Sequence, residues 1–79
     1  MTKDDISYLI KTRINNAVVN VYSDDNTHFE VIVISDDFSG ESRIVRHQLI
    51  YACLGNAVGN EIHALSIKAY TYNEWESLE

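Results

Sequence analysis

The block HFEVIVIS (residues 28–35) is followed by SRIVRHQLIYACL (residues 42–54) and then by HALSIKAY (residues 63–70). The first block is rich in β-branched residues and predicts a strand, whereas the second contains no helix breaker and predicts a helix. In the third block the apolar residues alternate, which predicts a half-buried strand with His63 on the core side. A strand, a helix and a strand in succession normally form a right-handed crossover, so we expect the two strands to be parallel.

The segment before these blocks predicts a helix and a hairpin. Thr2 and Asp5 have the spacing of a helix cap, and the apolar residues that follow predict a helix over residues 3–14. Residues 18–22 suit a short strand, and the polar residues 23–27 suit a turn that joins it to the next strand. The first two strands are therefore expected to form a hairpin.

The last residues predict one more short helix. Thr71 and Glu74 repeat the spacing of a helix cap, and this helix is expected to carry Trp75 back onto the domain. Together the segments predict an α+β fold, a two-layer sandwich of order α-β-β-α-β-α with a three-stranded mixed sheet.

The central helix is expected to turn one face to the core. Helical spacing places four residues on that face: Val45, Leu49, Ala52 and Cys53. Cys53 is interpreted as a small apolar core residue, because a buried thiol usually behaves as one. His47 would then lie on the exposed side of the helix.

Composition predicts one small domain that spans residues 1–79. Of the 79 residues 46% are apolar and none is proline. A domain of this size buries only about 60–65% of its unfolded surface, so we expect a single core layer and no enclosed active site. The longest apolar stretch is far shorter than the roughly 20 residues of a membrane span, and we expect no secretory signal. With one cysteine no intramolecular disulfide forms, which favours a cytoplasmic protein.

Charge and motifs disfavour two classes of function. Six Lys and Arg residues stand against twelve Asp and Glu residues, and the net charge of −6 repels nucleic acid at long range. The segment between Glu41 and Glu61 is an exception, since it lacks carboxylates and contains Arg43 and Arg46. The sequence has no glycine-rich phosphate loop, zinc-protease motif or serine-hydrolase elbow. We therefore expect a protein without enzymatic activity.

Two histidines open the two strands that are predicted to be parallel. Parallel neighbouring strands begin at the same end of a sheet, about 4.8 Å apart. His28 and His63 would therefore meet there and could share a metal. Alternation gives His28 the face of Glu30 and directs it to solvent. The core phase of His63 leaves the alternative of a buried structural histidine open.

Residues 33–51, residues 62–71 and the pair Glu74-Trp75 together resemble the BolA family. The short turn before His28 and the block SIKAYT are more similar to its IbaG branch. The resemblance covers essentially the whole chain. It implies a fold like that of a class II KH domain, in agreement with the element order above.

The resemblance also implies a partner and a cofactor. BolA proteins pair with monothiol glutaredoxins of the CGFS type, and the two chains can hold a bridging 2Fe-2S cluster together with glutathione. His63 matches the ligand histidine of the family. The second ligand is open: His28 is the nearest imidazole, Asp25 is one alternative, and binding through His63 alone is another. The implied role is the trafficking, maturation or sensing of iron–sulfur clusters.

A second role implied by the family is transcription regulation through DNA binding. The candidate contacts, on the central helix and the last strand, are Arg43, Arg46, His47, Gln48 and Lys68. The same residues are candidates for a glutaredoxin interface. The Gly-x-x-Gly loop with which KH domains clamp nucleic acid is missing from the sequence. Without a partner, the chain is expected to be a monomer or a weak homodimer.

Overall fold

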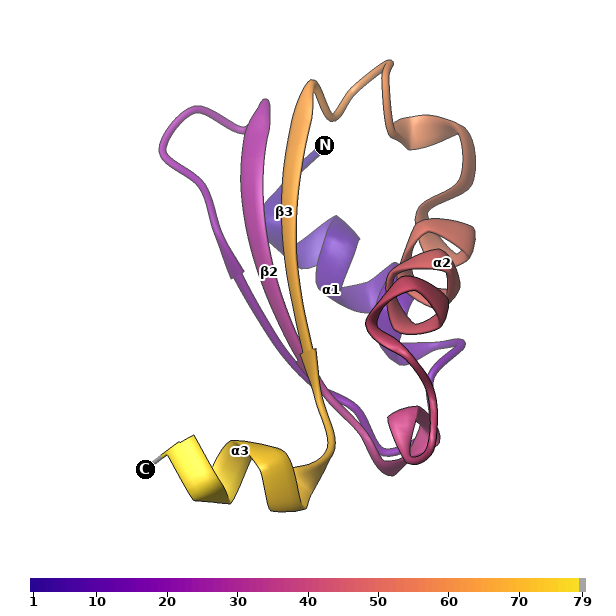
Figure 1. Ribbon diagram of the computed structural model, residues 1–79. Helices are drawn as coiled ribbons and strands as arrows, with labels where there is room; N and C mark the ends of the chain where they lie inside the picture. The colour runs from indigo at the N-terminus through magenta and orange to yellow at the C-terminus, as the bar shows by residue number, and fades with distance from the viewer. Residues whose placement is uncertain (79) are drawn as a thin grey trace.

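Three strands form one sheet, and two helices pack on one of its faces (Figure 1). The structure is a computed structural model that describes residues 1–78. Its elements are α1 (Lys3–Lys11), β1 (Val18–Tyr22), β2 (His28–Ile34), α2 (Arg43–Leu54), β3 (Ala64–Tyr70) and α3 (Tyr72–Leu78), with 3-10 turns at Asp36–Phe38 and Gly55–Ala57. The expected order of elements is confirmed. None of the described helices has the length and apolar character needed to cross a membrane.

The sheet is mixed, with β2 in its centre. β1 and β2 are antiparallel neighbours, and Tyr22 lies opposite Glu30. β2 and β3 are parallel neighbours, and their register sets His28 opposite Ala64. The hairpin and the parallel crossover predicted from the sequence are therefore both confirmed.

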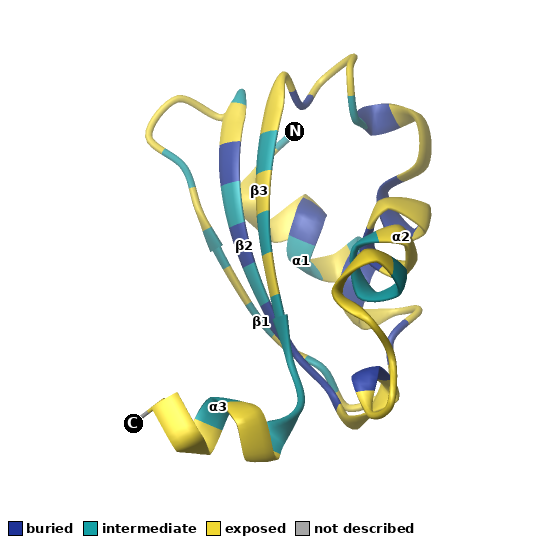
Figure 2. Cartoon of the chain, in the orientation of Figure 1, coloured by how far each residue is buried: buried dark blue, intermediate teal, exposed yellow. Residues whose placement is uncertain are grey.

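The core lies between the sheet and helices α1 and α2 (Figure 2). Alternate residues of β2 are buried there: Phe29, Val31 and Val33. Ile6 and Ile10 of α1 are fully buried in the same cluster. Each of these side chains stabilises the fold by roughly 1.5–3 kcal/mol on leaving water. The β2 residues of the other parity, which include His28, lie on the opposite face of the sheet.

Helix α1 ends at Lys11, earlier than the predicted end at Ile14. After Lys11 the Arg13 backbone N–H donates to Ile10 O, which is the tighter 3-10 spacing. The Thr12 hydroxyl also donates to the backbone and competes with continuation of the helix. Ile14 is nevertheless buried, so its side chain still joins the core.

Helix α2 turns a different face to the core from the one predicted. Its buried residues are Ile50, Cys53 and Leu54. The prediction is confirmed for Cys53 and wrong for Leu49, which is 42% exposed, and for Ala52, which is also exposed. Burial of Ile50 and Leu54 favours this face, because each large apolar side chain gains more by leaving water than the small Ala52 does. Arg46 lies four residues before Ile50, on the same side of the helix, and its guanidinium donates to Ala69 O of β3.

Helix α3 leaves the end of β3 and turns away from α1 and α2 (Figure 1). It begins with the predicted cap: Thr71 Oγ1 accepts the Glu74 backbone N–H at 3.2 Å, and the Glu74 carboxylate accepts that of Thr71 at 2.8 Å. The Trp75 ring lies against Tyr70 with the ring centres 5.5 Å apart. The helix therefore carries Trp75 back onto the domain, as predicted.

Candidate metal centre

His28 and His63 lie at the same end of the sheet. His28 is the first residue of β2, and its partner in β3 is Ala64. His63 comes directly before Ala64, and its backbone N–H donates to Thr27 O at 2.8 Å. The register thus confirms that the topology brings both histidines to one end of the sheet.

His63 does not face the core, which corrects the phase predicted from alternation. It is exposed and precedes β3, and the neighbouring Ile62 is fully buried instead. The phase changes because the chain before β3 forms a tight turn, in which Gly59 donates its N–H to Ile62 O and Ile62 donates its N–H to Ala57 O. The turn directs Ile62 inward, so a role for His63 as a buried structural histidine is excluded.

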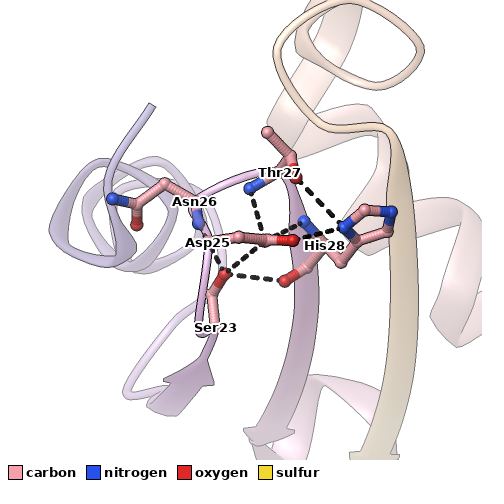
Figure 3. Close-up of polar contacts among 5 residues, drawn as sticks. All are labelled: Ser23, Asp25, Asn26, Thr27 and His28. Carbon is pink, nitrogen blue, oxygen red and sulfur yellow. Dashed lines mark hydrogen bonds and ion pairs between the residues drawn. The ribbon is translucent and has the colours of Figure 1, made fainter.

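The His28 imidazole is exposed and is held from one side (Figure 3). Its Nδ1 lies 2.7 Å from Asp25 Oδ2 and 3.0 Å from Thr27 Oγ1. The side chain is 65% exposed, and Nε2 lies on the side of the ring away from Asp25 (Figure 3). This confirms the solvent-facing phase predicted for His28.

The turn between β1 and β2 builds this arrangement from its own side chains. Asp25 Oδ1 accepts the backbone N–H of Thr27 at 3.0 Å and that of His28 at 2.9 Å. Ser23 Oγ accepts the N–H of Asn26 at 3.0 Å and donates to His28 O at 2.7 Å. Asn26 has a φ of 58°, in the left-handed region that asparagine tolerates. Short polar side chains therefore fix both the backbone and the ring of His28.

The same contacts keep Asp25 ionised. The backbone N–H groups of His28 and Thr27, followed by the His28 ring, hold the pKa of the Asp25 carboxyl well below its usual range. Both carboxylate oxygens are engaged within the turn. As a metal ligand Asp25 would lose one of these contacts, whereas as a hydrogen-bond acceptor it keeps them all.

The described residues supply only part of a coordination sphere. Residues 1–78 contain no group of three or more His, Cys, Asp and Glu side chains that could hold a metal ion. Cys53 lies on the buried face of α2, where burial raises the pKa of its thiol and Sγ donates to Leu49 O. It is a core residue, as predicted. The donor set, one exposed imidazole at the start of β2 and one directly before β3, fits a metal group that is shared with a second chain.

A second feature is an open groove between α2, β3 and α3, here called the α2 groove. It has a volume of about 650 Å³. Four of the five residues predicted to contact nucleic acid or a partner line it: Arg43, Arg46, His47 and Lys68. Gln48 is exposed but is not among the lining residues. Glu41 and Glu74 also line the α2 groove, so its charge is mixed.

Arg46 is used inside the fold. Its side chain is only 12% exposed, and its guanidinium makes two hydrogen bonds to the Glu74 carboxylate. It also donates to Glu41 O at 2.9 Å and to Ala69 O at 3.2 Å, and it lies 5.9 Å from the centre of the Phe38 ring. The guanidinium therefore has little surface left for nucleic acid or a partner. Sequence reasoning missed this role, because the partner carboxylate lies 28 residues further on.

Comparison with known proteins identifies the family of the chain. The model of the BolA-like protein family matches residues 5–74. The chain belongs to the BolA family. It is 38% identical to the acid stress protein IbaG of Escherichia coli (strain K12), over 95% of this chain and 89% of IbaG. It is 40% identical to the DNA-binding transcriptional regulator BolA of the same organism, over 76% of this chain but only 57% of that protein.

Solved BolA structures share the fold. A bolA protein homologue from Coxiella burnetii matches with a TM-score of 0.83 at 38% identity, over 96% of this chain and 97% of that chain. The expected architecture, a three-stranded mixed sheet with three helices, is thus confirmed by a relative as well as by the chain itself. The likeness to class II KH domains stays a prediction.

Proposed function

We propose that this BolA protein is a non-enzymatic partner of a monothiol glutaredoxin of the CGFS type, and that the two chains share a 2Fe-2S cluster. The observation that carries the proposal is the pair of exposed histidines at one end of the sheet, His28 at the start of β2 and His63 directly before β3. In this role the chain takes part in iron–sulfur cluster trafficking, maturation or iron sensing.

The two imidazoles suit half of a shared ligand set. In Rieske-type 2Fe-2S centres two histidines replace two cysteines on one iron, and this substitution raises the reduction potential. Here His28 offers Nε2 at the surface, and His63 offers its ring from the neighbouring strand. The cysteine of glutaredoxin and the thiol of glutathione would supply the remaining ligands, as the family resemblance implies.

The surface beside His28 gives a partner chain access to this end of the sheet. An open groove of about 410 Å³ lies there and is lined by residues of all three strands and of the β1–β2 turn. Tyr22, which lines it, is 54% exposed. A second chain docked against this surface would approach the imidazole of His28 without any movement of the core.

Anaerobic reconstitution with a CGFS glutaredoxin and glutathione tests the proposal. The measurements are visible absorption and circular dichroism of the cluster and its lifetime in the complex. We expect His63→Ala and His28→Ala each to change the spectra and to shorten the lifetime, because each removes one iron ligand. Tyr8→Ala is the control, since Tyr8 is an exposed ring on α1 that lines neither groove, and it should behave as wild type.

Two outcomes would contradict the proposal at different levels. Failure of the wild-type chain to form a cluster with the glutaredoxin would remove the function itself. A wild-type cluster whose spectra and lifetime are the same in His28→Ala and His63→Ala would keep the partnership but remove the ligand assignment.

DNA binding is a second candidate function, favoured by the similarity to the DNA-binding transcriptional regulator BolA of E. coli and by the cations of the α2 groove. Arg43 is exposed on α2, and Lys68 is exposed on β3 with Nζ 3.7 Å from Glu30 Oε1. The net charge of −6 opposes this function. The cationic residues left for phosphates are few, because the guanidinium of Arg46 is engaged within the fold.

A gel shift at about 150 mM salt separates this candidate from the first. DNA binding requires that the wild-type chain prefers a specific duplex over a random one and that Arg43→Ala weakens binding. Equal mobility with both duplexes would remove DNA binding. Arg46→Ala is unsuitable as the test variant, because loss of its contacts to Glu74 and Ala69 perturbs the fold as well.

A further inference from the structure

We propose that Asp25 is a positioning residue for His28: it holds the imidazole in the form protonated at Nδ1, so that Nε2 is the atom offered to a metal. The inference deepens the proposed function and rests on it for the use of Nε2. The protonation form itself is a property of the chain alone and can be measured without glutaredoxin or cluster.

The distance between the ring and the carboxylate fixes the form of the imidazole. His28 Nδ1 lies 2.7 Å from Asp25 Oδ2, and an ionised carboxylate can only accept a hydrogen bond. Nδ1 must therefore carry a proton. A neutral imidazole has one N–H, so Nε2 holds the lone pair. Thr27 Oγ1, at 3.0 Å from Nδ1, is placed as a second acceptor for the same proton.

The turn holds Asp25 itself in place. One carboxylate oxygen, Oδ1, accepts two backbone N–H groups, while the other, Oδ2, faces the ring. Ser23 fixes the carbonyl of His28 from the other side. The ring and its acceptor are thus anchored to one short segment, and the orientation of Nε2 does not depend on long-range packing.

Exposure argues that this contact serves orientation more than stability. The side chains of Asp25 and His28 are 50% and 65% exposed, and solvent-exposed pairs of this kind contribute little to folding. Histidines that bind metals usually donate their other ring N–H to a carboxylate or carbonyl, which fixes the ring and makes it a stronger ligand. Asp25 provides that acceptor before any metal is bound.

The decisive variant is Asp25→Asn, with Asp36→Asn as its control. Asparagine at 25 keeps the oxygen that accepts the two backbone N–H groups, but it presents an amide N–H to His28 Nδ1. A donor at that place favours the imidazole protonated at Nε2, in the way that asparagine inverts the histidine form in a serine-protease triad. Asp36→Asn removes the same charge from an exposed side chain in the turn after β2, at the other end of the sheet and outside both grooves.

The first measurement is nitrogen-15 NMR of the histidine rings in the chain alone, at about pH 8.5, well above the ordinary histidine pKa of about 6.5. We expect His28 protonated at Nδ1 in wild type and in Asp36→Asn, and protonated at Nε2 in Asp25→Asn. A wild-type ring protonated mainly at Nε2 would overturn the inference. This wild-type measurement decides the point even if Asp25→Asn fails to fold.

The second measurement is cluster retention against a competing chelator in the complex with a CGFS glutaredoxin and glutathione. We expect retention to fall about 10- to 100-fold in Asp25→Asn, the usual loss when the acceptor behind a metal-bound histidine is removed, and to be unchanged in Asp36→Asn. Equal retention in the two variants would overturn the positioning role. Absence of a cluster in the wild-type complex would instead refute the proposed function and leave the NMR result standing.

Discussion

Asp25 and Glu74 are carboxylates with similar local contacts at opposite ends of the sheet. Each accepts the backbone N–H of a nearby threonine: Asp25 that of Thr27 at 3.0 Å and Glu74 that of Thr71 at 2.8 Å. In both cases the contact fixes the chain where an element begins, β2 in one case and α3 in the other. The two carboxylates differ in the side chain that each one holds.

The difference lies in reach and shielding. Asp25 holds His28, three residues away and 65% exposed, whereas Glu74 holds Arg46, 28 residues away and 12% exposed. We call the second contact, between Arg46 and Glu74, the helix clamp. Because it joins α2 to α3 through a guanidinium that is largely buried, although the Glu74 side chain is 46% exposed, the clamp contributes more to stability than the contact in the turn, which mainly orients a ring. The same chemistry thus serves stability at one end and presentation of a ligand atom at the other.

Breaking the helix clamp should give the largest effect. We expect Arg46→Ala to lower the free energy of unfolding by about 2 kcal/mol, because it removes charged hydrogen bonds to Glu74, a partly buried one to Ala69 O and an exposed one to Glu41 O. Urea unfolding measures the loss, and hydrogen exchange should show that the amides of α3 lose protection. Arg43→Ala, an exposed arginine on the same helix, is the control and should change stability by less than about 0.5 kcal/mol. Equal losses in both variants would contradict the clamp.

Acid should weaken the clamp through Glu74. The hydrogen bonds from Arg46, followed by the Thr71 N–H, lower the pKa of Glu74 from 4.5 to about 2. A carboxyl whose pKa is lower in the folded chain stabilises the fold fully above its unfolded pKa, and this stabilisation is lost as the pH falls toward the folded pKa. Between about pH 5 and about pH 2 the unfolding free energy should therefore fall more steeply in wild type than in Glu74→Gln. Parallel curves would show that the clamp does not depend on the charge of Glu74.

Glu76→Gln is the control for this titration. It removes one carboxylate from the same helix without touching Arg46, so its curve should keep the wild-type slope. The lowered pKa of Asp25 and that of Asp5 also reduce stability in acid. Both groups are present in all three proteins, so the difference between the curves isolates Glu74.

Local signals in the sequence were sufficient for the order of the elements. The cap spacing of Thr71 and Glu74 and the β-branched run in β2 each act within a few residues, and both elements formed where they were predicted. The errors lie where distant contacts decide. The face of α2 follows from the packing of Ile50 and Leu54 in the core, and the exposure of His63 follows from the tight turn that buries Ile62.

The candidate site was predictable in position but not in detail. The crossover rule alone predicted that His28 and His63 lie at one end of the sheet, because parallel neighbouring strands begin at the same end. The role of Asp25 as an acceptor was within reach too, since its spacing of three residues from His28 inside a turn is a local signal. The engagement of Arg46 with Glu74 was not, because nothing in the sequence links two residues so far apart.

The smallest effect is expected at the histidines themselves, in the chain without a partner. His28→Ala and His63→Ala should each change the free energy of unfolding by less than about 0.5 kcal/mol, because both residues are exposed and neither belongs to the core. Urea unfolding of these variants beside Arg46→Ala compares the free energies of unfolding for changes at the two ends of the sheet. A loss above about 1 kcal/mol in either histidine variant would mean that the imidazole supports the fold. Loss of a cluster in that variant could then no longer be attributed to loss of a ligand, so near-neutral stability is the condition under which the spectra of the complex identify the residues that bind iron.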